Sequence, residues 1–120
     1  MKKISSKEIK KYLDMPYSYV ITKANDESGE YYVARILELD GLMGTGNTYE
    51  EAYEDIKDAM GGYIETKLAN NITIPLPLDS SEYSGKFVVR LPKTLHKLIS
   101  KRAKEEGVSL NQYALYKLAL

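Results

Sequence analysis

The stretch Gly85-Lys86-Phe87-Val88-Val89-Arg90-Leu91-Pro92 decides the fold of the C-terminal part of this 120-residue chain. Side chains of a β-strand point alternately to its two faces. One face of a strand over 86–91 would carry Phe87, Val89 and Leu91, and the other Lys86, Val88 and Arg90. Pro92 has no backbone N–H and ends such a strand. We therefore expect a short strand with one apolar and one largely basic face.

Two short helices are predicted to follow this strand. The first begins near Lys93, and Gly107 is suited to the position just after its end. Its apolar stripe is Leu95, Leu98, Ile99 and Ala103. Ser109 is a typical N-cap residue for the second helix. That helix carries Leu110, Tyr113, Ala114 and Leu118.

A strand and two helices in about 35 residues are too small to form a stable core alone. The chain has no cysteine, so disulfides cannot support this module. Pairing the strand with its symmetry mate would complete the core and protect one strand edge. We therefore expect a homodimer through the strand, with any higher assembly left open.

A two-stranded ribbon of this kind fits the major groove of DNA, where Lys86 and Arg90 could donate to guanine. Backbone amides at Ser109 and Leu110, where the second helix begins, could hold a phosphate. An alternative is that the strand joins an N-terminal sheet and that Lys86 and Arg90 are simply solvated.

The C-terminal module resembles the ribbon-helix-helix fold of small bacterial repressors over residues 85–119. The resemblance implies that Lys86, Val88 and Arg90 contact bases. It also implies that the amides of Ser109, Leu110 and Asn111 hold the DNA backbone. Val88 departs from the usual polar residue at its position, although it could still contact a thymine methyl group.

The N-terminal part is predicted to be a small α/β unit. Two capping boxes, Ser5 with Glu8 and Thr48 with Glu51, predict helices over about 6–14 and from Thr48 to about Leu68. Alternating patterns predict strands over 17–23 and 31–37, joined by a turn at 25–29. Weaker signals predict short strands at 42–45 and 72–74.

The polar side of the long helix carries the acidic residues Glu50, Glu51, Glu54, Asp55 and Asp58. Several of them favour the positive N-terminus of a helix, so a solvated capping face is one interpretation. A partner-binding face is the other, with Glu50, Glu54 and Asp58 as its candidate residues.

Charge is divided unevenly along the chain, although the net charge is zero. Residues 1–85 hold 9 Lys and Arg against 15 Asp and Glu, a balance of −6, and residues 86–120 hold 8 against 2, a balance of +6. A basic module suits a polyanion, and an acidic one suits a basic protein surface. Alternatively, the basic tail folds back on the acidic body.

The sign of the charge changes near a linker that contains Pro75, Pro77 and the polar run 79–82. We therefore expect an N-terminal domain over 1–78, a linker over 79–84 and a DNA-binding domain over 85–120.

The N-terminal part resembles the HicB family of antitoxins in the strings Glu30 to Gly41, Gly44 to Ala52, and Ile74-Pro75-Leu76-Pro77. The resemblance implies an α+β protein: a partial, non-catalytic RNase H-like domain followed by the ribbon-helix-helix domain. It implies that the N-terminal domain binds HicA, a small basic mRNA-cleaving toxin. It further implies that the C-terminal dimer binds operator DNA and represses the operon. The sequence departs from the family pattern at Leu37, Asp40 and Leu42.

Enzyme chemistry is not expected. The chain has a single histidine, His96, and no cysteine, and Gly44-Thr45-Gly46 lacks the remainder of a phosphate-binding motif. An RNase H-like nuclease needs clustered carboxylates that hold metal ions, and no motif here suggests them. We expect no catalytic residues, metal or cofactor. With neither a signal peptide nor a membrane-spanning run in the sequence, we expect a cytoplasmic protein.

These expectations combine into an autorepressing antitoxin. The alternative is a stand-alone ribbon-helix-helix repressor whose N-terminal domain senses a small ligand.

Overall fold

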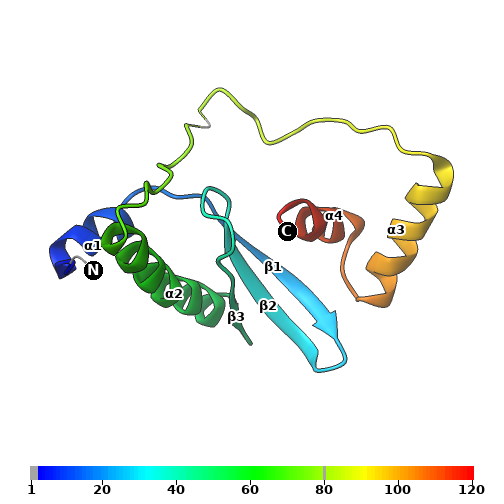
Figure 1. Cartoon of the computed structure of the whole chain (residues 1–120). Helices are drawn as coiled ribbons and strands as arrows, with labels where there is room; N and C mark the ends of the chain where they lie inside the picture. The colour runs from blue at the N-terminus through cyan, green and yellow to red at the C-terminus, as the bar shows by residue number, and fades with distance from the viewer. Residues whose placement is uncertain (1–2, 80) are drawn as a thin grey trace.

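The computed structural model describes residues 3–79 and 81–120 and shows a mixed α/β fold (Figure 1). In chain order its elements are α1 (Ser6–Leu13), β1 (Tyr19–Asp26), β2 (Gly29–Ile36), β3 (Gly44–Gly46), α2 (Tyr49–Ala69), α3 (Lys93–Glu105) and α4 (Leu110–Leu118). The strands form one antiparallel sheet in the order β1-β2-β3.

The helix starts lie where the capping residues predict them. The side chain of Ser5 accepts a hydrogen bond from Glu8 N at 3.2 Å, and that of Thr48 accepts one from Glu51 N at 3.1 Å. Ser109 caps α4 in the same way, accepting from Gln112 N at 3.0 Å. Each bond satisfies an amide that has no partner within its helix, so the local sequence sets these boundaries.

The hairpin of β1 and β2 is longer than its sequence pattern predicts. Asn25 and Asp26, expected in the turn, are paired residues of β1, and Asp26 lies opposite Gly29. Gly29 has a φ of 111°, which a residue with a side chain rarely adopts. Because Gly29 can turn the chain so tightly, only Glu27 and Ser28 are left to form the loop.

The main core lies between the sheet and α2. Every fourth residue of α2 from Ala52 to Ile64 is fully buried: Ala52, Ile56, Met60 and Ile64. They pack with Ala34 and Ile36 of β2, which point to the same side of the sheet. This stripe is the one that helical spacing predicts.

The strand β3 is a short edge that packs closely on α2. It covers residues 44–46, whereas 42–45 was expected. A Cβ on Gly44 would stand 2.6 Å from the backbone nitrogen of Ile56 and 2.8 Å from the carbonyl oxygen of Ala52. The glycines therefore allow the backbones of strand and helix to touch.

The short strand expected at 72–74 is absent from the described part of the chain. The segment is held by side chains instead of by a strand partner. Ile74 is 5% exposed within the main core, and the hydroxyl of Tyr17 donates to the carbonyl oxygen of Pro75 at 2.6 Å. An extended backbone with a buried isoleucine resembles a strand in sequence, although its own amides do not pair with a strand.

Glu38 fastens the chain after α2 to the start of β1. Its carboxylate accepts hydrogen bonds from Ser18 N at 3.0 Å, Ser18 Oγ at 2.8 Å and Leu78 N at 2.9 Å. Burial alone would raise the pKa of Glu38, but these hydrogen bonds outweigh it and hold the pKa below the usual value.

Glu38→Gln is expected to lower the free energy of unfolding by about 1–2 kcal/mol at pH 7, because one of the two acceptor oxygens is lost. A lowered folded pKa stabilises the fold fully above the unfolded glutamate pKa of about 4.3, and this contribution disappears as the pH falls through the folded value. Urea unfolding at several pH values should therefore show the two proteins converging in acid. A difference that is constant from pH 7 to pH 3 would contradict the assigned role of the carboxylate.

The C-terminal helices fold back on the free face of the sheet, with α4 against β1 (Figure 1). Thr22, Ala24 and Val33 point to this face and are at most 4% exposed. Ala103 of α3 and Tyr113 of α4 are buried to the same degree and lie outside the main core cluster. The sheet is thus a middle layer between α2 and the C-terminal module.

Candidate functional site

The expected strand over 86–91 is not a strand in this structure. The segment is extended and exposed, with Phe87 75% and Val88 91% accessible. A strand is defined by its partner, and the single chain offers none to this segment within its described residues. The alternative, in which the strand joins the N-terminal sheet, therefore does not hold in this structure, whereas pairing with a second copy stays a prediction.

Beside this segment lies an apolar groove of about 930 Å³. Apolar residues from the segment, from α3 and from α4 line it: Phe87, Val89, Leu91, Ile99, Leu110 and Leu118. Leu95 and Leu98 of α3 are also more than 40% exposed. Large apolar side chains gathered on one exposed face are typical of an interaction surface. His96 lines the groove too, at its exposed edge.

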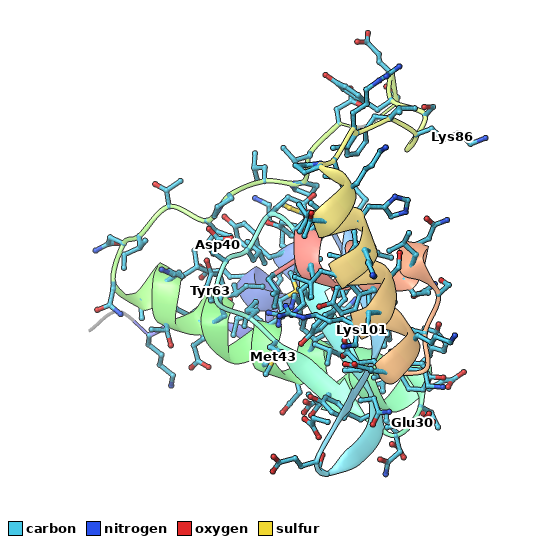
Figure 2. The ribbon with its side chains drawn as sticks, turned by 90° about the vertical axis from the view of Figure 1, so that its right-hand side faces the viewer. Glu30, Asp40, Met43, Tyr63, Lys86 and Lys101 are labelled. Atoms are coloured by element: carbon cyan, nitrogen blue, oxygen red, sulfur yellow. The ribbon has the colours of Figure 1, made fainter. Side chains whose placement is uncertain are left out.

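The six residues predicted to contact DNA are only partly brought together. Lys86, Val88, Leu110 and Asn111 line the same groove, whereas Arg90 and Ser109 are outside its lining. Figure 2 shows Lys86 extending away from the body of the protein. Among the described residues, no salt bridge engages Lys86 or Arg90, so both cations face solvent. Because 86–91 is not a strand here, its basic and apolar side chains are not separated onto two opposite faces as expected.

The start of α4 presents free backbone amides, as the predicted phosphate contact requires. The hydroxyl of Ser109 is occupied by Gln112 N, which leaves the amides of Leu110 and Asn111 as the first unsatisfied donors of the helix. Asn111 is exposed and Leu110 is half-buried. The partial positive charge of a helix N-terminus favours an anion at this position.

The acidic residues in the first half of α2 divide into two groups. Glu51 accepts a hydrogen bond from Asn47 N at 2.6 Å, and Asp55 accepts one from Thr45 N at 2.8 Å, so both support the edge around β3. Glu50, Glu54 and Asp58 follow one another at steps of four, are exposed and make no hydrogen bond among the described residues. The structure thus leaves the three candidate toxin-binding residues available on one helix face.

Sequence reasoning missed the polar contact between the two parts of the chain. Asn25 Nδ2 of β1 donates to the carbonyl oxygen of Glu106, next to the turn between α3 and α4, at 3.3 Å. The sequence signal for this contact was the division of charge between 1–85 and 86–120, because it left open the alternative that the basic tail folds back on the acidic body.

Over 3–79 and 81–120, no group of three or more His, Asp or Glu side chains is placed to hold a metal ion. None of the helices there has both the length and the apolar character needed to cross a bilayer.

These features define a small protein with an acidic sheet domain and a basic helical module that carries an exposed apolar groove. Residues 69–118 match the HicB family. The chain is 43% identical over 61 residues to a UPF0150 protein of Thermoplasma acidophilum, and the match covers 51% of this chain and 84% of that protein. The chain therefore belongs to the family of that UPF0150 protein, and its C-terminal part is similar to the HicB family.

Among solved structures, the chain is similar to the antitoxin HicB of Burkholderia pseudomallei, with a TM-score of 0.44 and 14% sequence identity. The similarity covers 88% of this chain and 97% of that one.

Proposed function

We propose that this protein is the antitoxin of a HicA/HicB-type pair. Its N-terminal domain, residues 1–78, binds and covers a small basic mRNA-cleaving toxin. Its C-terminal domain, residues 85–120 after a linker at 79–84, dimerises as a ribbon-helix-helix unit and represses its own operon. The protein itself catalyses no reaction and uses no cofactor.

The observation that carries this proposal is the apolar groove beside exposed Lys86 and Arg90, within the segment that matches the HicB family. A second copy of 86–91, paired antiparallel to the first, would bury Phe87, Val89 and Leu91 against α3 and α4. The same pairing would turn Lys86, Val88 and Arg90 outward together, which is the arrangement that the major groove requires.

The toxin-binding role is supported by charge and by availability. The balance of −6 over residues 1–85 suits a basic protein, since complementary charge steers association. Glu50, Glu54 and Asp58 are the acids in the first half of α2 whose side chains the fold leaves unused, which makes them the candidate contacts.

The direct test is growth of cells that express the small open reading frame next to this gene, with and without this protein. Arrest by the neighbour alone and recovery on co-expression would support the antitoxin role. A triple variant with Glu50, Glu54 and Asp58 changed to lysine should then lose the rescue, and Glu65→Lys on the same helix is the matched control. Absence of toxicity, or toxicity without rescue, would instead favour a stand-alone repressor with a ligand-sensing N-terminal domain.

Arg90→Ala is expected to weaken specific operator binding by about 1–3 kcal/mol, a loss of roughly 5- to 150-fold in affinity, because one base contact disappears. Fluorescence anisotropy with the duplex upstream of this gene, at one fixed salt concentration, measures the loss. Lys11→Ala, an exposed cation of α1, is the control that should bind as the native protein does. Undiminished affinity of the Arg90 variant would remove this residue from the DNA-contacting face.

A further inference from the structure

The helix α4 uses different faces for two different contacts. Leu110, Ala114 and Leu118 line the apolar groove, whereas Tyr113 is outside the groove lining and is buried, at 4% exposure, as is Ala103 of α3. The helix as a whole also contacts β1. The C-terminal module can therefore dock on the sheet while its groove stays open to a second copy.

The docked position brings the end of the β1–β2 hairpin, residues 25–30, close to the turn that precedes α4. This hairpin end is called the acidic loop below. Besides the hydrogen bond from Asn25 to Glu106, the Glu30 carboxylate lies 4.0 Å from where a Cβ on Gly107 would stand. Figure 2 shows Glu30 at the end of the hairpin that carries Asp26 and Glu27.

The charges on the loop are only partly balanced. Lys23 pairs with Glu30 at 3.3 Å. Asp26 has no cationic partner among the described residues, and hydrogen bonds from Ser28 and Tyr31 hold its pKa below the usual value. Glu27 is exposed, so the loop as a whole presents negative charge beside the α3–α4 turn.

We propose that this docked form restrains DNA binding in cis, because the acidic loop of the hairpin opposes a DNA phosphate at the start of α4. The inference rests on the proposed DNA-binding role. Carboxylates near the helix start repel an approaching phosphate and weaken the anion site that the free amides of Leu110 and Asn111 form. Undocking removes this repulsion, so any partner that draws the hairpin away from α4 raises operator affinity.

A removable cross-link tests the proposal in the full chain. Because the protein has no cysteine, the double variant Asn25→Cys with Glu106→Cys would contain the only two thiols. The native side chain of Asn25 already reaches the backbone of Glu106, so we expect a disulfide within one chain on oxidation. The oxidised protein should bind the duplex upstream of its gene at least 10-fold more weakly than the same sample after reduction. Each single cysteine variant, treated identically, should show no such change.

Two results would overturn the proposed restraint, and a third would overturn the DNA-binding role on which it rests. Equal affinity before and after reduction would show that docking does not restrain binding. A disulfide that forms between two chains instead of within one would show that the contact within one chain is not populated. The cross-link could also form while the reduced protein and both single variants bind no DNA. That result would support the docked form and contradict the proposed DNA-binding function.

A charge variant tests the same idea without a cross-link. Glu27→Gln combined with Glu30→Gln should raise affinity for the duplex about 3- to 10-fold at low salt, and the gain should shrink as salt screens the loop. The matched control is Asp40→Asn with Glu65→Gln, two exposed acids; Asp40 lies well away from Glu30 in Figure 2. An equal gain in the control would show that the effect comes from net charge alone. That result would overturn the proposed repulsion between the acidic loop and a DNA phosphate.

Discussion

Gly44→Ala is expected to destabilise the N-terminal domain by about 3 kcal/mol, because its methyl group has no free space. The added Cβ would stand 2.6 Å from Ile56 N and 2.8 Å from Ala52 O, and both atoms belong to the backbone of α2. Backbone within a 21-residue helix cannot rotate away as the end of a side chain can. Relief therefore requires β3 to move off the helix, a disturbance at the upper end of the overpacking range.

Gly62→Ala is the matched control, since the same methyl group is added within α2 at an exposed site with nothing within 4 Å. Alanine forms helices better than glycine, so this variant should gain up to about 1 kcal/mol. Thermal or urea unfolding should thus show shifts of opposite sign for one chemical change. A Gly44 variant with the midpoint of the native protein would mean that β3 does not pack on α2 as described.

Local chemistry explains which parts of the fold could be predicted from sequence. Ser5, Thr48 and Ser109 each satisfy an amide within three residues of themselves, so the starts of α1, α2 and α4 follow from short stretches of sequence. The buried stripe of α2 follows in the same way, because helical periodicity alone places Ile56, Met60 and Ile64 on one face.

The errors arose where contacts distant in sequence decide the conformation. Residues 72–74 are extended because Ile74 enters the core between the sheet and α2 and because the hydroxyl of Tyr17 donates to the carbonyl oxygen of Pro75. No pattern within 72–74 distinguishes that situation from a strand. The predicted end of β1 was too early because Gly29, whose positive φ shortens the turn, lies outside the predicted strand.

The candidate site was predictable in its residue types and only partly in its geometry. The basic and apolar alternation at 86–91 and the cap at Ser109 identified the segments that line or flank the groove. The docking of α4 on the sheet could not be derived, because Tyr113 has the same helical spacing whether it faces a sheet or a dimer partner. Asn25 is an ordinary turn residue in sequence, and its contact with Glu106 exists only in the assembled fold.

Phe87→Asp is expected to raise the dissociation constant of the dimer by at least 100-fold. Phe87 is 75% exposed in the single chain, so the proposed burial of its ring occurs on pairing, within the apolar groove. Removing a buried phenylalanine costs about 3–5 kcal/mol in a protein core, and a two-fold interface loses the contact twice. A carboxylate in the same place adds a desolvation cost.

Sedimentation of the full chain over a range of concentrations measures this loss, and Leu76→Asp is the matched control. Leu76 is 62% exposed outside the groove lining, so the same change there should leave association intact. A monomeric Phe87 variant should also lose operator binding, because Lys86 and Arg90 reach the major groove only as part of a paired ribbon. If the variant stays dimeric and binds the operator normally, association does not use this strand, and the basic residues must reach DNA in another arrangement. The two measurements together therefore separate the role of the strand in pairing from the role of its charges in binding.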